Sequence, residues 1–282
     1  MAESIRVTVL VENTAFGRHT LGEHGLAYWI EAGEHRVLFD TGQTPESLLH
    51  NAEHLSIDLS TADAVVLSHG HYDHTGGLES VLELTDKAKI FLHPGALKRR
   101  YSRQKDGKVL AIGIPPGMTE AHIRSQTASL AWTDGVTELV PGIHVTGYVH
   151  RENDFEDTGG AFFLDEECRH PDPIEDDQAV FFDTSEGTVV LLGCAHAGVV
   201  NTLRSVRAET GGRPIHTVIG GMHLVNASPE RMDRTIDALR ELDVERLAPA
   251  HCTGARAQAI LAAEFPDTWE PTHVGSRFEF VR

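Results

Sequence analysis

The sequence predicts an α/β fold in which two similar halves pack as one domain, with two sheets inside and helices outside. Strand-like apolar runs alternate with helix-like segments along the chain. The second half also echoes the first. "GTVVLLGCAH" (187–196) parallels "EHRVLFDTG" (34–42), and "HTVIGGMH" (216–223) parallels "DAVVLSHGH" (63–71). Because each unit has an apolar sheet face to cover, we expect four layers in the order αββα. No clear linker interrupts residues 1–282, so a single domain is expected.

The first half opens with strands. Residues 5–11 are apolar and β-branched, and two further runs are joined by the glycine-containing turn "AGEH" (32–35). A helix follows, because Thr44 is a good N-cap and Pro45 suits the first helical position. Further on, a short run reads as a strand covered on both faces, followed by a helix and another strand. The ranges of these later elements are 64–67, 76–84 and 89–92.

The second half contains another helix, capped by Ser228 and started by Pro229. Two less periodic excursions, near 94–127 and 150–177, are expected to be lids or loops over the rest of the fold. The first includes "LKRRYSRQKDGK" (97–108), the most basic stretch of an acidic chain. We interpret it as an exposed segment, since charge runs usually face solvent. In the alternative interpretation its cations meet an anionic substrate.

Composition and charge limit the classes of function. The formal net charge is −18, which argues against nucleic-acid and anionic-membrane binding but not against a small anionic substrate near a metal ion. The N-terminus reads as a strand rather than a signal peptide, and no apolar run approaches the length of a membrane span. Three cysteines far apart imply no disulfide framework. We expect a cytoplasmic protein, with a homodimer as the default assembly.

The segment "VVLSHGHYDHTGGL" (65–78) carries the main functional signal. A core strand ends at Ser68, and then His69, His71, Asp73 and His74 follow within six positions. Alternate residues of an extended loop share a side, so the first two histidines can converge, while the other two residues lie in the turn beyond. Imidazole and carboxylate are ligands that zinc and its first-row neighbours prefer. Such a polar cluster is tolerable after a buried strand if a cation satisfies it.

This pattern resembles the HxHxDH signature of the metallo-β-lactamase superfamily of binuclear hydrolases. The resemblance spans nearly the whole chain. It extends to one branch, whose members are often described as similar to a dihydropterin ribofuranosyl-aminobenzene phosphate synthase. The further segments that carry it, in order, are "EHGLAYWIE" (23–31), "VLFDTG" (37–42), "GCAHAGVVNT" (193–202), "IGGMHL" (219–224) and "PAHCTG" (249–254). The resemblance implies the four-layer αββα sandwich of the metallo-β-lactamase type.

The resemblance also implies a set of metal ligands. The residues expected to bind metal are His69, His71, Asp73 and His74. His251, near the end of the sequence, is expected to join Asp73 and His74 at one site. About two zinc ions per chain are expected, and manganese, iron, cobalt or nickel would suit the same ligands. Asp40 is expected to orient a ligand histidine, as metal sites commonly require. Asn201 and Thr253 are expected to hold ligand loops through hydrogen bonds.

The chain departs from the wider superfamily at the end of one strand. Many members end it with Gly-Asp, and that aspartate bridges two metals; a separate histidine occurs some twenty residues earlier. Here the segment reads Cys194-Ala195-His196, so the bridging aspartate is absent. Either His196 replaces the earlier histidine, or His150 or His170 supplies it. We favour His196.

Other residues are candidates for binding or proton transfer. His24 lies in "EHGL" before a strand and is either a solvated turn residue or a pocket residue. Asn13, at the end of the first strand, is a similar case. His223 ends the half-repeat partner of the metal strand and is either a satisfied core histidine or a group that binds substrate or donates a proton. Cys252 is interpreted as a small buried residue rather than a reactive thiol or soft ligand.

The implied function is a metal-dependent hydrolase that uses a metal-bound hydroxide on a phosphoester, with a phosphodiester or cyclic phosphate preferred. Asp73 would orient the nucleophile while binding metal, and His223 or His24 would donate a proton or bind the substrate. One alternative is a lactone or thioester hydrolase. Another is a mono-iron dioxygenase, or a member of the same fold that binds a ligand without turnover.

Overall fold

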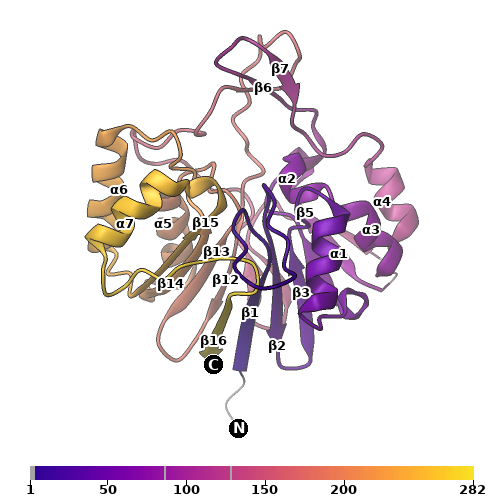
Figure 1. Cartoon of the computed structure of the whole chain (residues 1–282), viewed down its shortest axis with the longest axis horizontal. Helices are drawn as coiled ribbons and strands as arrows, with labels where there is room; N and C mark the ends of the chain where they lie inside the picture. The colour runs from indigo at the N-terminus through magenta and orange to yellow at the C-terminus, as the bar shows by residue number, and fades with distance from the viewer. Residues whose placement is uncertain (1–3, 86, 128) are drawn as a thin grey trace.

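The computed structural model describes residues 4–85, 87–127 and 129–282. Two sheets pack face to face and helices cover their outer faces (Figure 1), which confirms the predicted αββα arrangement. The first sheet has the strand order β16-β1-β2-β3-β4-β5-β8. Its strands are β1 (Ser4–Val11), β2 (Ala27–Ala32), β3 (His35–Phe39), β4 (Ala64–Val66), β5 (Lys89–Leu92), β8 (Ser129–Trp132) and β16 (Arg277–Val281).

The second sheet has the strand order β15-β14-β13-β12-β10-β9. Its strands are β9 (Thr137–Val140), β10 (Ile143–Val145), β12 (Ala179–Asp183), β13 (Thr188–Leu192), β14 (Ile215–Gly221) and β15 (Arg246–Ala250). The space between the sheets is filled by a core to which both contribute, including Phe39 and Val66 from the first sheet and Phe182 and Leu191 from the second. Burial of these apolar faces is the main force that joins the two halves.

Separate groups of helices cover the two sheets (Figure 1). The first sheet is covered by α1 (Pro45–His54), α3 (Leu78–Leu84) and α4 (Glu120–Gln126), and the second by α5 (Val199–Glu209), α6 (Pro229–Glu241) and α7 (Ala255–Glu264). The predicted caps are present. The Thr44 side chain accepts a hydrogen bond from the Ser47 N–H, and Ser228 accepts one from the Arg231 N–H. Within the described residues, no helix is long and apolar enough to cross a membrane.

One local prediction was imprecise. Asp73 and His74 lie in the short helix α2 (Tyr72–Thr75) and not in a turn, while the helix expected at 76–84 is present as α3. The helical turn sets these two side chains at a fixed angle to one another at the end of β4.

The parallel pairs of strands decide where a site can form. β3 pairs with β4, and β13 pairs with β14 and β14 with β15, all in parallel. The carboxyl ends of these strands therefore lie at one edge of the sandwich, where α/β proteins commonly bind ligands. The two half-repeats recognised in the sequence are these parallel units, and each ends in a polar turn at this edge.

The two excursions meet above the same edge. β6 (Tyr101–Arg103) and β7 (Val109–Ala111) form a hairpin, and β11 (Phe162–Phe163) adds to β6 in a three-stranded sheet. This sheet projects at the top of the molecule (Figure 1). The expectation that the whole basic stretch is exposed was wrong at Arg100, which is 2% exposed. Its guanidinium pairs with Asp172 and Asp176, so burial of the cation is compensated.

Candidate metal centre

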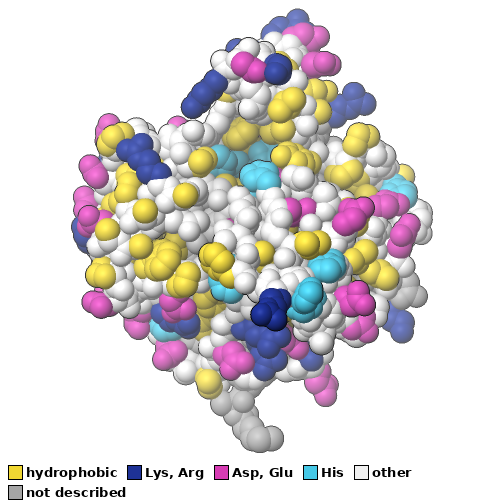
Figure 2. Space-filling view, viewed as in Figure 1, with side chains coloured by type: hydrophobic (Ala, Val, Ile, Leu, Met, Phe, Trp, Pro, Cys, Tyr) yellow, Lys and Arg dark blue, Asp and Glu magenta, His cyan; other side chains and the backbone are white. Residues whose placement is uncertain are grey.

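A cavity of about 500 Å³ opens at the edge where β13, β14 and β15 end, beneath the β6–β7 hairpin. Figure 2 shows histidine side chains gathered in this hollow. The hairpin contributes Ser102, Gln104 and Leu110 to the cavity wall. The candidate site residues that line it are His24, His71, Asp73, His196, His223 and His251, together with Asn13. His69 and His74 lie below them and are fully buried.

The loop after β4 brings its own residues together. The Nε2 atom of His69 is 3.0 Å from the Nδ1 atom of His71. The His69 and His74 ring centroids are 4.3 Å apart. The Asp73 carboxylate lies 3.8 Å from His74 Nε2. The short spacing in the sequence therefore becomes a single cluster in space.

Two histidines of the second half complete the cluster. The ring of His196 lies 4.7 Å from that of His69 and 4.8 Å from that of His71. His251 Nε2 is 3.3 Å from both His74 Nε2 and Asp73 Oδ2. The alternatives to His196 lie elsewhere, because His170 is exposed and bonds to Asp165, and His150 is exposed beside Tyr148.

The outer nitrogens of four histidines are held by acceptors, which fixes the position of each ring proton. His74 Nδ1 is 2.7 Å from Asp40 Oδ2, and His196 Nδ1 is 2.8 Å from the Thr158 carbonyl. His251 Nδ1 is 2.8 Å from Asn13 Oδ1. The Ser68 hydroxyl donates to Asp40, so it accepts from His69 Nδ1 at 2.9 Å.

Each of these four rings consequently directs its Nε2 atom inwards. His74 Nε2 and His251 Nε2 face one another at 3.3 Å, so at most one of the two can carry a proton. His196 Nε2 is buried with no hydrogen-bond partner. Ring nitrogens that converge with too few donors between them are satisfied by a cation, and buried polar atoms are rarely left unsatisfied. The residues present therefore fit zinc or a similar first-row ion.

The pKa values support this arrangement. Burial lowers the pKa of His71 to about 3 and that of His251 to about 4, so both rings are neutral near pH 7. Burial also lowers the pKa of His74, but the charges of Asp40 and Asp73 outweigh it and raise that pKa to about 9. Burial raises the pKa of Asp73, but the contacts with His74, His24 and His251 have the larger effect. They lower this pKa to well below its usual value. The surroundings of His74 thus favour positive charge.

His24 lies beside Asp73, and His223 lies beside His196. His24 is about half exposed, and its Nε2 atom is 3.2 Å from Asp73 Oδ2. His223 is 9% exposed, its ring lies 4.3 Å from that of His196, and its Nδ1 atom is buried without a partner. Burial lowers the pKa of His223 to about 4. Both therefore reach the cavity, His24 at its mouth and His223 at its wall.

Several strand-end residues adopt left-handed backbone conformations that are unusual for side chains other than glycine. The φ angles are 62° for Asp40, 53° for Ala195, 45° for His223 and 49° for His251. Such conformations cost of order 1–3 kcal/mol each and persist where the surroundings enforce them. All four lie in turns that follow strands at the edge of the sandwich where the cavity opens.

Asn201 and Thr253 each make hydrogen bonds that join separate segments near the cavity. The Asn201 side chain donates to the Ala197 carbonyl and accepts from backbone N–H groups of residues 152 and 153. The Thr253 hydroxyl accepts from the Met222 N–H. Each holds a loop that carries a candidate ligand or pocket residue.

Sequence reasoning missed two other supports. Asp176 accepts from the Gly70 N–H, between His69 and His71, and Asp177 accepts from the Ala197 N–H, next to His196. These adjacent carboxylates therefore hold one metal loop in each half of the molecule. Their only signal in the sequence was a run of acidic residues, which is typical of a solvated loop.

Cys194 is the candidate ligand that sequence reasoning missed. Its Sγ atom is 3.1 Å from His74 Nε2. We define two groups from the ligand atoms that lie within 4.8 Å of one another: the His69 group (His69, Cys194, His196) and the His74 group (His74, Cys194, His251). The missed signal was its position after Gly193, where the superfamily pattern has aspartate. Cys252 belongs to neither group and is buried, with its thiol 3.5 Å from the Cys194 carbonyl.

Comparison with known proteins assigns the family. The model of the metallo-beta-lactamase superfamily matches residues 21–251, and the chain belongs to this superfamily. A 7,8-dihydropterin-6-methyl-4-(beta-D-ribofuranosyl)-aminobenzene-5'-phosphate synthase from Methanocaldococcus jannaschii is 30% identical, over 99% of this chain and 97% of the relative. The predicted family and branch are thereby confirmed.

Solved structures agree with this assignment. The crystal structure of a metal-dependent hydrolase of the beta-lactamase superfamily has a TM-score of 0.82 and 30% identity, and covers 99% of this chain and 100% of that one. A diphosphatase of the PhnP family has a TM-score of 0.56 and 14% identity, covering 100% of this chain and 99% of that one. At that identity, the second likeness shows the fold alone.

Proposed function

We propose that the protein is a metal-dependent hydrolase of phosphoesters, with a phosphodiester or cyclic phosphate ahead of a monoester. The observation that carries this proposal is the set of four histidine Nε2 atoms directed into one buried space, with an aspartate beside them. His69, His71 and His196 would hold one ion, and Asp73, His74 and His251 the other. Zinc is preferred, and manganese, iron, cobalt and nickel suit the same ligands.

Bound zinc supplies a Lewis acid and lowers the pKa of water towards ~7, so that hydroxide forms at neutral pH. The remaining roles belong to the protein. Asp73 has a depressed pKa, so it is ionised and can accept a hydrogen bond that orients a nucleophilic water. His24 contacts Asp73 and steadies it. His223 is neutral, and its N–H can donate to a leaving-group oxygen in the cavity.

The charge of the cavity wall favours a substrate with one negative charge. Among its lining residues in the described part of the chain there is no lysine or arginine. The cations of the basic stretch are largely engaged elsewhere: Arg100 with two aspartates, Lys98 with Glu175. The alternative that this stretch meets the substrate therefore loses support. A phosphodiester carries one charge and needs fewer compensating cations than a dianionic monoester, which suits the metal ions and the neutral donors Asn13, Tyr72 and Ser102.

The relatives support the reaction class and the kind of substrate in this proposal. One structure at 30% identity is that of a metal-dependent hydrolase, and the name of the Methanocaldococcus jannaschii relative includes a 5'-phosphate. We transfer from them a reaction class and a phosphate-bearing substrate, and no particular compound.

The test combines metal analysis with turnover of bis(p-nitrophenyl) phosphate. Protein purified without chelator should contain about two equivalents of zinc, as in two-metal hydrolases. The His196→Ala variant should lose about one equivalent and most turnover, whereas the control His170→Ala, at an exposed histidine away from the site, should retain both. Turnover that survives His196→Ala, or a wild-type protein without bound metal, would overturn the proposal.

The same preparation separates the alternatives. Parallel assays with a lactone and a thioester show whether the acceptor is a carbonyl carbon instead of phosphorus. Iron as the bound metal, together with oxygen uptake and no ester turnover, would indicate a dioxygenase. Bound metal with no turnover of any substrate would indicate a binding protein on the same fold.

A further inference from the structure

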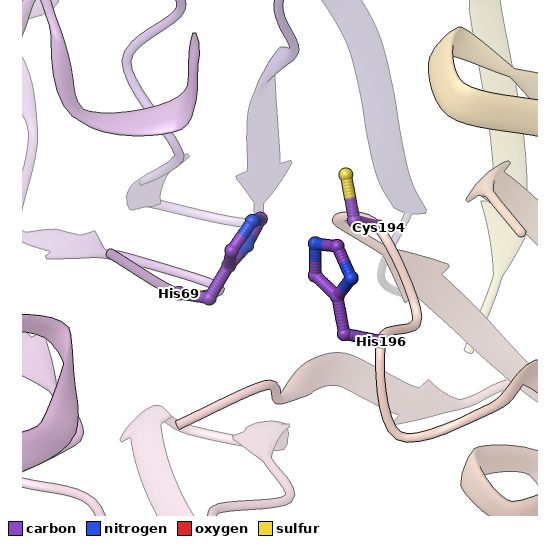
Figure 3. A group of neighbouring side chains, drawn as sticks. All are labelled: His69, Cys194 and His196. Carbon is purple, nitrogen blue, oxygen red and sulfur yellow. The ribbon is translucent and has the colours of Figure 1, made fainter. Parts of the chain in front are cut away.

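Cys194 lies where the two halves of the metal centre meet. It follows β13 and precedes His196 by two residues, and it is 3% exposed. Figure 3 shows its sulfur and the rings of His69 and His196 facing a common space between two strand ends. A Cβ atom at Gly193 would collide with the Ser68 hydroxyl. Glycine therefore permits the close approach that places Cys194 beside the loop after β4.

The sulfur is shared by both groups of candidate ligands. It belongs to the His69 group and to the His74 group, and in each the ligand atoms lie within 4.8 Å of one another. The Sγ atom is 3.1 Å from His74 Nε2. Cys194 is the one residue common to these two groups within the described residues. Its position is therefore that of a ligand between two ions.

A purely structural role leaves too many lone pairs unsatisfied. A thiol has one proton, so it can donate to only one acceptor. The Nε2 atoms of His71 and His196 would stay buried without a partner. Two cations with the sulfur between them satisfy all of these atoms.

We propose that Cys194 is a thiolate ligand shared by two metal ions, in the place where the superfamily pattern has a bridging aspartate. The proposal rests on the metal centre of the proposed function. On metal binding the S–H bond breaks, two metal–sulfur bonds form, and the proton passes to solvent. Because thiolate is a softer ligand than carboxylate, the centre should prefer zinc, cobalt or iron(II) to manganese or magnesium.

Cobalt-substituted protein provides the first test. Wild-type protein with about two equivalents of Co²⁺ should show a near-ultraviolet sulfur-to-cobalt charge-transfer band. Cys194→Ser and Cys194→Asp should lose that band, and the aspartate variant should still bind about two cobalt ions because a carboxylate can bridge. The control Cys252→Ser removes the neighbouring buried thiol, which lies in neither group, and should keep the band. A band that persists in Cys194→Ser would overturn the proposal.

X-ray absorption of zinc-loaded wild-type protein provides a second test that needs no variant. A sulfur neighbour at roughly 2.3 Å from zinc is expected, and its absence would overturn the proposal even if the Cys194 variants fail to fold. The outcomes also separate this inference from the proposed function. A sulfur ligand without ester turnover supports the thiolate and contradicts the hydrolase, whereas ester turnover with no sulfur on the metal does the reverse.

Discussion

The His69 and His74 groups share Cys194 but are supported in different ways. In the His74 group, carboxylates act close to the rings: Asp40 bonds to His74, and Asp73 lies beside His251. In the His69 group the outer ring nitrogens bond to the Ser68 hydroxyl and the Thr158 carbonyl, which carry no net charge. Its loops are held instead through their backbone, by Asp176 and Asp177.

This difference indicates unequal affinity for metal. Negative charge around a ligand ring makes the ring a stronger donor and favours a cation nearby. The pKa of His74, raised to about 9 by its carboxylate neighbours against the effect of burial, reports the same field. In the His69 group, burial lowers the pKa of His196 and His69 well below the usual value, and no carboxylate reverses it. We therefore expect the ion in the His74 group to be held more tightly.

Removal of Asp73 should have the largest effect. Asp73→Asn removes an anionic oxygen beside the His74 group and the acceptor that would orient the nucleophile. Losing Lewis-acid stabilisation of several kcal/mol corresponds to a fall in turnover of ~10³-fold. Turnover and zinc content should be compared with those of Asp233→Asn, an exposed change on α6 that should leave both unaltered. An Asp73→Asn protein as active as wild type would contradict the assigned role.

Replacement of Asp40 should weaken binding of the ion that the His74 group would hold. Asp40→Asn removes the charge that supports His74, and supporting partners of this kind change metal affinity by about 10- to 100-fold. Competition with a chelator measures the zinc affinity of each ion. Asn13→Ala, which removes the neutral partner of His251, should cost less than Asp40→Asn. Equal losses in the two variants would show that charge is not what distinguishes the groups.

Replacement of Asp176 should weaken binding of the ion that the His69 group would hold. Asp176→Asn disturbs the Gly70 N–H contact and also one half of the buried Arg100 pair, so we expect destabilisation of about 3 kcal/mol. Zinc in the His69 group should bind ~10-fold more weakly, with little change in the His74 group. Asp172→Asn is the matched control, since it pairs with Arg100 but touches neither metal loop. If both variants lower zinc affinity equally, the effect is general destabilisation.

Truncation of Phe162 should have the smallest effect. Its ring lies 5.2 Å from that of His71 and 5.4 Å from that of His196, on the side of the His69 group. Phe162→Ala opens this side to water, and chelator should extract the His69-group ion a few-fold faster. Phe163→Ala changes the next residue, which packs against Arg103 instead. Phe163→Ala should leave the extraction rates unchanged. If it accelerates extraction as much as Phe162→Ala does, the cause is loosening of the whole three-stranded sheet of β6, β7 and β11.

Local patterns predicted much of the fold and part of the site. The helix caps at Thr44 and Ser228 could be predicted because a cap is a contact between residues three apart. The cluster of His69, His71, Asp73 and His74 could be predicted for a similar reason, since a strand end and one helical turn bring these residues together. Arg100 was misread because its partners lie 72 and 76 residues away, and a run of cations gives no sign of them.

The sequence by itself determined which donor types the chain offers and that a strand end presents several of them at once. It could not show what each donor faces. Only the parallel register of β13, β14 and β15 beside the end of β4 brings His196, Cys194 and His251 to the same space. The proton positions were likewise decided by tertiary contacts, because a histidine directs a lone pair inwards only when an acceptor holds its other nitrogen, as the Thr158 carbonyl does for His196.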